Sequence, residues 1–305
     1  MVFPWKPVNP TCDVAVDARA ELGERPVWDD RDRALVWVDI PRGQLRRYSP
    51  DSGTDTLVKQ VDGSVGCVAL REGGGLLIGA DRQVQLLDNS GALDGVIHTP
   101  GADDALFNDG AVDPGGRFVG GTSTAATRPG GGALYSFSPD GEVRILVDSV
   151  TESNGVGWSP DGTTMYYVDS GETYFGSATS TAVRTYDYDV DSGSAVRVRD
   201  LAVLTEDEGI PDGLVVDAEG AIWLAVWGGS ELRRYAPDGT LLDRVPVPAS
   251  QVTCPGFGGD DLSDLYVTTA HQGLDEVARA VEPLAGNIFH LTPGVSGLPA
   301  TRYRG

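Results

Sequence analysis

A short pattern recurs six times along the 305-residue chain and constrains the fold more than any other feature of the sequence. Each copy contains a turn, a short apolar strand, a turn of the Asp-Gly kind and a second apolar strand. One position of the pattern serves as a marker, and consecutive markers are 42, 42, 46, 58 and 42 residues apart. Repeats of this length are typical of β-propellers, in which each blade is a small sheet that buries its faces against its neighbours. The six markers are Glu24, Gly66, Asn108, Asn154, Asp212 and Cys254.

The apolar runs of each repeat indicate strands that are covered on both faces. β-Branched and aromatic residues form partly continuous runs at 35–39, 165–169 and 222–226, and such runs are typical of strands buried on both sides. Reverse turns containing Asp-Gly separate the later strands, since Asp stabilises a turn and Gly takes its left-handed position. We therefore predict an all-β fold, a six-bladed β-propeller of four-stranded antiparallel blades.

The ends of the repeat array define the expected boundaries. Residues 12–18 alternate between polar and apolar side chains, and we expect them to form an N-terminal strand that closes the ring by pairing with the last blade. Residues 274–281 form the one segment that we expect to be helical. The prediction is a single six-bladed β-propeller domain over residues 1–305, with 1–11 as an N-terminal extension.

The composition limits the partners of the chain. There are 45 acidic residues against 23 lysines and arginines, a net charge of −22, which argues against nucleic-acid binding because that needs clustered cations. No run approaches about 18 apolar residues, and the first residues lack the apolar core of a secretory signal. The three cysteines form no CxxC pair, which is typical of a reducing compartment. We expect a cytoplasmic protein with a small-molecule substrate, no nucleic-acid or membrane partner, and a monomeric or weakly homo-oligomeric state.

The marker position carries the candidate chemistry. A radial array brings equivalent positions of all blades to one axis, and four markers bear side-chain oxygens: Glu24, Asn108, Asn154 and Asp212. Carboxylate and amide oxygens are hard ligands that suit Ca²⁺, Mg²⁺ or Mn²⁺. A bound dication polarises a carbonyl oxygen and lowers the pKa of water. Either Asp212 or Glu24 would accept the proton of the attacking water.

Long loops are expected above the same cluster. The connections between the second and third strands are longest in the third, fourth and sixth repeats, at 122–131, 170–182 and 270–285. In a four-stranded blade these connections lie on the face where the innermost strands begin, so they would overhang the markers and enclose a substrate pocket. His271 on the last of these loops is a candidate substrate contact, whereas Cys254 is expected to serve either in packing or as pocket wall.

Other motifs are either structural or absent. Asp29, Asp113 and Asp217 each lie five residues after a marker with Pro or Gly nearby, and we expect them to form turns. The chain contains no GxSxG nucleophile motif and no phosphate-binding loop that ends in Gly-Lys. Serine-hydrolase and nucleotide-dependent chemistry are therefore not expected.

Five segments in sequence order resemble one protein family. LGERPVWD at 22–29, FNDGAVDPGGRFVGGT at 107–122 and SNGVGWSPDGTTMYYVDS at 153–170 are followed by matching segments at 211–229 and 252–270. Through them the chain resembles the SMP-30/gluconolactonase/regucalcin family of six-bladed propellers over nearly its full length. The resemblance implies a lactonase, a hydrolase of carboxylic ester bonds, with one divalent metal in the central channel.

The same resemblance implies roles for individual residues. It places the metal ligands at Glu24, Asn154 and Asp212, with Asp212 also as general base. It gives Asn108 a contact to the substrate or to metal-bound water. Ca²⁺ is the expected ion, with Mg²⁺, Mn²⁺, Zn²⁺ and Fe²⁺ as alternatives.

The chain departs from the family pattern near the expected substrate. Sugar-lactone members commonly carry Arg where Leu106 stands, and an acidic residue in the loop that here reads STAAT at 123–127, followed by Arg128. We include Leu106 and Arg128 as candidate substrate contacts. The departures argue against a simple aldonolactone and leave the metal chemistry intact.

Hydrolysis of a cyclic ester is the primary hypothesis. The alternatives are a non-hydrolytic metal-dependent enzyme acting on a larger, less polar substrate, which Leu106 favours, and a calcium-binding or interaction propeller without catalysis.

Overall fold

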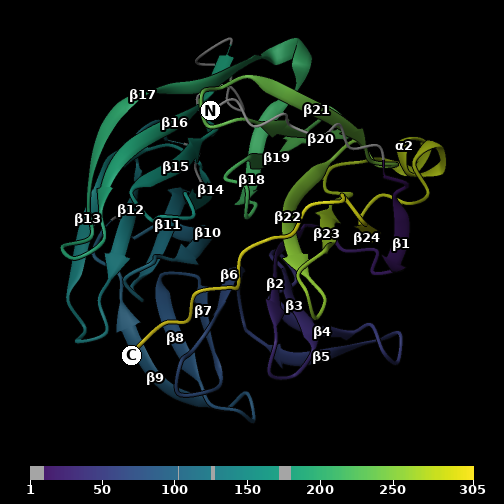
Figure 1. The fold of residues 1–305 in the computed structure, drawn as a ribbon. Helices are drawn as coiled ribbons and strands as arrows, with labels where there is room; N and C mark the ends of the chain where they lie inside the picture. The colour runs from purple at the N-terminus through teal and green to yellow at the C-terminus, as the bar shows by residue number, and fades with distance from the viewer. Residues whose placement is uncertain (1–9, 102, 125–127, 172–179) are drawn as a thin grey trace.

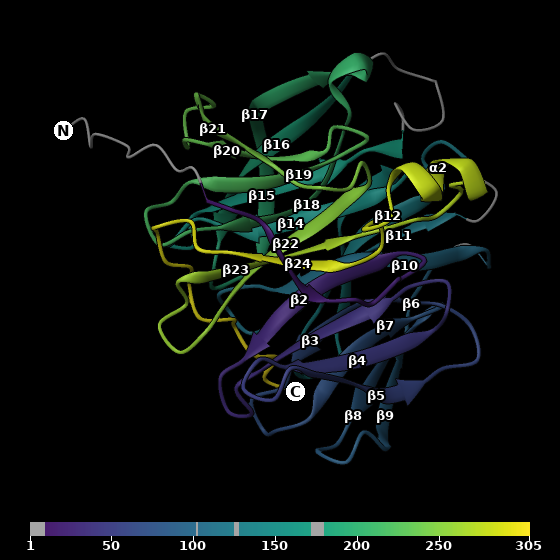
Figure 2. The same cartoon turned by 90° about the vertical axis from the view of Figure 1, so that its right-hand side faces the viewer.

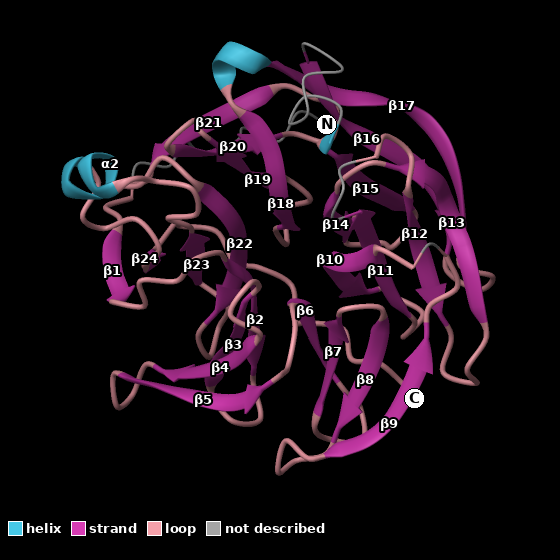
Figure 3. Ribbon diagram, turned by 180° about the vertical axis from the view of Figure 1, so that it is seen from behind, coloured by secondary structure: helices cyan, strands magenta, loops and turns pink. Residues whose placement is uncertain are grey.

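The computed structural model describes residues 10–101, 103–124, 128–171 and 180–305. Within them, six four-stranded antiparallel sheets are arranged as blades around a central axis (Figure 1). The predicted six-bladed propeller is therefore confirmed. Viewed from the opposite side, the innermost strands of the blades face one another around the centre (Figure 3). Residues 1–9 of the predicted N-terminal extension lie outside the described residues.

Within each blade the strands follow the sequence from the centre to the rim, except for the exchanged strand of the last blade. The first three blades comprise β2 (Gly23–Asp29), β3 (Ala34–Asp39), β4 (Gln44–Ser49) and β5 (Thr54–Gln60); β6 (Val65–Leu70), β7 (Leu76–Ala80), β8 (Gln83–Leu87) and β9 (Leu93–His98); and β10 (Ala105–Val112), β11 (Phe118–Thr124), β12 (Gly132–Phe137) and β13 (Val143–Val150). The last three comprise β14 (Ser153–Trp158), β15 (Thr164–Asp169), β16 (Ser180–Asp189) and β17 (Ser194–Thr205); β18 (Ile210–Val216), β19 (Ile222–Trp227), β20 (Glu231–Tyr235) and β21 (Leu241–Pro246); and β22 (Val252–Gly258), β23 (Asp264–Thr269), β24 (Ile288–Leu291) and β1 (Asp13–Val16). A short 3₁₀ helix, η1 (Glu206–Glu208), precedes β18, and α2 (Glu276–Val281) lies between β23 and β24.

The first strand of the chain closes the ring, as predicted. β1 pairs antiparallel with β24, with Asp13 opposite His290 and Val14 opposite Phe289. The last blade therefore gains its outermost strand from the start of the chain, and no gap in strand pairing separates the two ends of the array. The predicted helix is also present. It begins after Asp275, whose side chain accepts a hydrogen bond from the Ala278 backbone N–H at 2.8 Å, the usual role of an N-cap residue.

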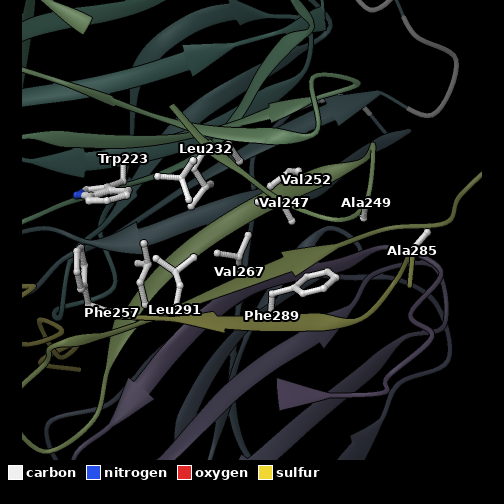
Figure 4. Close-up of a cluster of buried hydrophobic side chains, with 13 residues drawn as sticks. Trp223, Leu232, Val247, Ala249, Val252, Phe257, Val267, Ala285, Phe289 and Leu291 are labelled. Carbon is white, nitrogen blue, oxygen red and sulfur yellow. The ribbon is translucent and has the colours of Figure 1, made fainter. Parts of the chain in front are cut away.

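Apolar side chains fill the spaces between neighbouring blades. Trp223 and Leu232 of the fifth blade share one buried cluster with Val267 and Phe289 of the sixth (Figure 4). Trp223 also meets Phe257 edge to face, with ring centroids 6.2 Å apart. Fully burying one large apolar side chain contributes about 1.5–3 kcal/mol. Because each strand near the centre is covered on both sides, its sequence is apolar without strict alternation.

Each innermost strand of the described ring is irregular at its marker residue. Pairing of β2 with β3 shifts between Glu24 and Val27, and pairing of β18 with β19 shifts between Pro211 and Leu214. Shifts occur at the corresponding place in β6, β10, β14 and β22. A β-bulge bends the strand and redirects a side chain. The bulges therefore explain how one position of every blade is presented to the central channel.

The innermost strands also approach one another closely. A Cβ atom on Gly66 would lie 2.2 Å from the Phe107 carbonyl oxygen, and one on Gly213 would lie 2.5 Å from the Cys254 Sγ. Contacts this short leave no room for a side chain in a close-packed interior. Gly66, the marker of the second blade, is therefore needed for packing, and the polar markers come from other blades.

The two faces of the ring differ. A side view places α2 at one face and the C-terminal segment at the other (Figure 2). The C-terminal segment crosses the ring, where the Tyr303 backbone N–H donates to the Leu70 carbonyl oxygen at 2.8 Å. Of the three long loops expected beside the pocket, residues 125–127 and 172–179 lie outside the described residues. No helix in the described part of the chain is long and apolar enough to cross a membrane.

Candidate active site

A hydrogen-bonded pair of amides occupies one side of the channel. Asn108 on β10 donates from Nδ2 to the Asn154 Oδ1 and to the Ser153 carbonyl oxygen, each at 2.8 Å. Asn154 on β14 donates from its own Nδ2 to the Ser170 Oγ. These bonds fix the orientation of both amides. Asn154 therefore has its Oδ1 to offer to a cation, and Asn108 has its Oδ1 to offer to a ligand.

Two buried carboxyl groups converge on the same part of the channel. Glu24 on β2 is 5% exposed and Asp212 on β18 is 7% exposed. Burial, followed by the negative charge of Asp109, raises the pKa of Glu24 to about 8. Burial raises the pKa of Asp212 well above its ordinary value, and the charges of Glu24, Asp109 and Glu152 raise it further. β2 and β18 both pack against β22, which brings these two carboxyls to one part of the channel although they are far apart in the sequence.

The oxygen atoms around the channel suit a hard divalent cation. Glu24 and Asp212 supply carboxyl groups, Asn154 supplies an amide oxygen, and the Asp109 Oδ2 is buried without a hydrogen-bond partner among the described residues. A bound cation would favour the ionised carboxylates and relieve the repulsion between them. Within the described ranges no three His, Cys, Asp or Glu side chains form a metal-binding group by themselves. The donor set proposed from these residues includes the Asn154 amide oxygen.

Cys254, the marker of the sixth blade, lies on β22, which packs between β2 and β18. The side chain is fully buried. Burial, followed by the charges of Glu24 and Asp109, raises the pKa of its thiol. A thiol that resists ionisation is a poor nucleophile and a poor metal ligand. These surroundings suit the wall position that the sequence indicates for Cys254.

Glu152 is a channel residue that the sequence analysis missed. Its carboxyl accepts a hydrogen bond from the Ser123 hydroxyl, and burial raises its pKa to about 7. Ser123 lies opposite Leu106 in the pairing of β10 with β11. A carboxyl group and an apolar side chain therefore border the same part of the channel mouth, the end where the innermost strands begin. The signal in the sequence is the spacing, because alternate residues of a strand share a face and Glu152 precedes Asn154 by two.

Arg25 and Asp109 were also missed, and each directly follows a marker residue. The Arg25 Nη1 lies 3.6 Å from the Asp109 Oδ1. The Arg25 backbone N–H donates to the Glu24 Oε2 at 2.7 Å. The two residues lie on β2 and β10, which belong to different blades. Nothing in their spacing predicts this ion pair, because it depends on how the two bulges are oriented.

Arg128 and His271 differ in their surroundings, since Arg128 pairs with a carboxylate and the buried His271 Nδ1 has no hydrogen-bond partner among the described residues. Arg128 is exposed and forms an ion pair with Asp104. His271 is buried, and its backbone N–H donates to the Glu21 carbonyl oxygen at 3.2 Å. Within the part of the chain that the structure describes, neither side chain has a hydrogen bond or an ion pair to the four polar markers. The predicted cluster of Glu24, Asn108, Asn154 and Asp212 is brought together, and the roles of Arg128 and His271 as substrate contacts stay predictions.

A second part of the channel is apolar. A cavity of about 340 Å³ opens beyond the polar cluster and is lined by Ala111, Val156, Leu214 and residues 298–301 of the C-terminal segment, among others. None of the predicted metal ligands lines it. A pocket without convergent polar groups offers no means to activate a substrate. The chemistry therefore belongs to the mouth of the channel and not to this cavity.

Comparison with known proteins agrees with the geometry. Residues 22–271 match the family model described as SMP-30/Gluconolactonase/LRE-like region. The chain belongs to this family. Regucalcin from Danio rerio is 36% identical over 303 residues, which cover 96% of this chain and 98% of that protein.

Solved structures of the family superpose closely on this member. The calcium-binding protein regucalcin from Agrobacterium tumefaciens gives a TM-score of 0.88 at 29% identity, with 99% of this chain and 100% of that chain covered. A luciferin-regenerating enzyme gives a TM-score of 0.85, also at 29% identity, with 97% and 100% covered. The predicted family resemblance is confirmed over nearly the whole chain.

Proposed function

We propose that this protein is a lactonase that uses one divalent cation to open a cyclic ester. The observation that carries the proposal is the convergence of Glu24, Asn154 and Asp212 on one part of the channel. The family description includes gluconolactonase, which supports the same class of reaction. Ca²⁺ is the first choice of ion because all the donor atoms are oxygens, and the Agrobacterium tumefaciens relative is described as calcium-binding.

Each residue has a distinct role in the proposed reaction. A cation held by Glu24, Asn154 and Asp212 would polarise the ester carbonyl. Asp212 accepts the proton of the attacking water, a role open to a buried carboxylate that a bound cation would keep ionised. Asn108 presents its Oδ1 as an acceptor beside Asn154 and so orients the water or a substrate hydroxyl.

The mouth of the channel limits the substrate. Glu152, held by Ser123, is an acceptor for a substrate hydroxyl, and Leu106 opposite Ser123 provides an apolar contact. We infer that the substrate is a lactone that bears both a hydroxyl group and an apolar portion. Arg128 and His271 remain candidate contacts at the surrounding loops.

The test compares metal-free and metal-loaded protein. After treatment with a chelator, acid release is followed over a panel of sugar, alkyl and aryl lactones, with and without added Ca²⁺, Mg²⁺, Mn²⁺ or Zn²⁺. We expect turnover only with metal. Asp212→Asn should abolish it, and Asp261→Asn should not, since Asp261 only caps an exposed turn through Ser263. Turnover that persists without metal, or absence of turnover across the panel, contradicts the proposal.

A non-hydrolytic enzyme on the same scaffold is the second candidate. Leu106 favours it, because an apolar side chain at the mouth suits a larger, less polar substrate. The two candidates differ in the fate of water. In ¹⁸O-labelled water, hydrolysis places one labelled oxygen in the product acid, whereas a rearrangement places none. A third outcome, metal binding without turnover of any compound, indicates a calcium-binding propeller without catalysis.

We also propose a cytoplasmic location and a monomeric or weakly homo-oligomeric state. The three cysteines are free thiols, which supports a reducing compartment. Fractionation of cells and sedimentation at several protein concentrations test these two expectations. A purified protein that sediments as a tight oligomer at nanomolar concentration contradicts the second.

A further inference from the structure

Arg25 adopts a backbone conformation that an arginine does not favour. Its φ angle is +45°, in the left-handed region, and it lies within the bulge of β2 directly after Glu24. A residue with a side chain is strained there, and such strain is retained where the surrounding structure holds the residue for another reason. Arg19 and Arg33 have similar φ angles, but they are exposed, with side chains 77% and 55% accessible.

The guanidinium of Arg25 is turned into the channel. Its side chain is only 13% exposed, and its Nη1 lies 3.6 Å from the Asp109 Oδ1, whose side chain is 2% exposed. The Arg25 Nε and the Asp109 Oδ2 are buried without hydrogen-bond partners among the described residues. The pair is therefore held together mainly by charge. Glu24 and Cys254 are also within electrostatic reach of the guanidinium.

Arg25 also marks the boundary between the two halves of the channel. It contributes to the lining of the 340 Å³ apolar cavity, and it is the one charged residue among the described residues that line it. On its other side lie Glu24 and Asp109. A cation at this boundary acts on the polar half, because charges interact more strongly where water is excluded.

Arg25 offsets part of the negative charge of the polar half. Glu24, Asp109 and Asp212 contribute three negative charges when ionised, and Glu152, whose charge also acts on Asp212, contributes a fourth. Arg25 contributes one positive charge beside Asp109. A buried site with unbalanced charge is costly. Without Arg25 the same carboxylates would favour an ion of higher charge more strongly.

We propose that Arg25 is a built-in counter-ion of the metal centre, which neutralises Asp109 and thereby sets the affinity of the site and its preference for divalent ions. Arg25 is a positioning residue in this role, since it acts through Asp109 and not on the substrate. The inference rests on the metal centre of the proposed function. It predicts that the effects of removing Arg25 and Asp109 are not additive.

Direct metal binding tests the inference. The dissociation constant for Ca²⁺ is measured by calorimetry on chelator-treated full-length protein. Asp109→Asn leaves the Arg25 charge unpaired beside the cation, so we expect the affinity for Ca²⁺ to fall about tenfold or more. Adding Arg25→Gly removes that charge, and the double variant should return to within about threefold of the unmodified protein.

Arg25→Gly alone provides a second, independent readout. Glycine accepts the φ angle of +45°, so the substitution introduces no backbone strain. Because Coulomb energy scales with ionic charge, the ratio of Tb³⁺ to Ca²⁺ affinity should rise by about threefold or more. Arg33→Gly, at an exposed position with a similar φ, controls for the backbone change and should leave the ratio unaltered.

The outcomes separate the two proposals. If the unmodified protein binds no divalent ion, the proposed function fails and the counter-ion role fails with it. If it binds Ca²⁺ but the double variant is as weak as Asp109→Asn, the counter-ion role alone is overturned and the lactonase proposal stands. An unchanged Tb³⁺ to Ca²⁺ ratio in Arg25→Gly overturns the counter-ion role as well, even if Asp109→Asn does not fold.

Discussion

Asp212 and Asp217 lie five residues apart at the two ends of the innermost strand of the fifth blade, and their surroundings differ in kind. Asp217 is fully buried and accepts hydrogen bonds from the backbone N–H of Ala221 at 2.8 Å, from the Trp223 Nε1 at 3.0 Å and from the Arg234 Nη2 at 2.7 Å. Asp212 is nearly as buried, but its carboxyl receives a hydrogen bond from the Gly213 backbone and faces the charges of other carboxyls. The Asp217 carboxylate is stabilised by hydrogen bonds and an ion pair, whereas ionisation of the Asp212 carboxyl is disfavoured by burial and by neighbouring carboxyls.

The difference shows that the repeat uses one aspartate position to stabilise the fold and another to form the candidate site. Asp113, in the third blade, is surrounded as Asp217 is, since it accepts from the Arg117 backbone and guanidinium and from the Tyr188 hydroxyl. The turn aspartates are therefore structural, as the sequence predicts. The carboxyls at the mouth lack such partners, and a buried carboxyl without a partner favours its neutral form unless a cation is bound. The predictions below test this division.

Asp212→Asn should have the largest effect of these substitutions, and it should lower the activity without lowering the stability of the metal-free protein. Losing both a metal ligand and the general base should lower kcat/KM by about 10³–10⁴-fold. The metal-free variant should be as stable as the unmodified protein or more stable, because one repelling carboxyl is gone. Steady-state kinetics and thermal unfolding with chelator measure the two quantities. A marked loss of stability in the metal-free variant would remove the distinction between the two aspartates.

Asp217→Ala should have the converse effect. Arg234 is fully buried, and removing its main carboxylate partner should lower the free energy of unfolding by about 3–5 kcal/mol. The affinity for Ca²⁺ should change by less than about threefold at a temperature where the variant is folded. Urea unfolding and calorimetry provide the two measurements. Asp113→Ala serves as a replicate from another blade, and a variant that keeps its stability but loses metal binding would reverse the assignment.

The stability of the metal-free protein should depend on pH through the mouth carboxyls. The pKa of Glu24 is raised from 4.5 to about 8, so the folded protein holds a proton that the unfolded chain releases. A group of this kind stabilises the fold fully below the unfolded pKa, and the contribution is lost as the pH rises from about 4.5 to about 8. The melting temperature with chelator should fall by roughly 5 °C between pH 5 and pH 8. Saturating Ca²⁺ should abolish most of this decrease, whereas equal losses with and without Ca²⁺ argue against Glu24 as a ligand.

Glu152→Gln should have the smallest effect and should act on the substrate. Replacing a charged acceptor weakens a hydrogen bond to a substrate hydroxyl by about 1–1.5 kcal/mol, or about tenfold in kcat/KM. Hydroxylated lactones should lose this factor, and lactones without hydroxyls should not. Leu106→Ala offers the opposite comparison, because it should affect mainly lactones with an apolar portion. Equal losses for both classes of lactone would argue against a specificity role for Glu152.

The sequence was sufficient for the fold and for the principal cluster, because both follow from the repeat. The marker position predicts that Glu24, Asn154 and Asp212 converge, since radial symmetry acts on sequence spacing alone. It does not predict the partnership of Arg25 and Asp109, which depends on bulge geometry in two different blades. Nor does a repeat indicate the direction of side chains on irregular loops, so the assignment of Arg128 and His271 to the pocket stays a prediction from loop position.

The C-terminal segment has a consequence for the order in which the molecule is completed. Arg302 forms an ion pair with Asp29 of the first blade at 2.9 Å, the Tyr303 backbone bonds to Leu70 of the second, and the Arg304 backbone N–H bonds to the Gly116 carbonyl oxygen beside the third. The first three blades thus gain these contacts only after the sequences of all six blades have been synthesised. The first half of the ring therefore depends on residues that follow the sixth blade, and the sixth blade depends on β1 for its outermost strand. A chain cut after β24 keeps every blade sequence but lacks these contacts, so its first three blades should be less stable than in the longer chain.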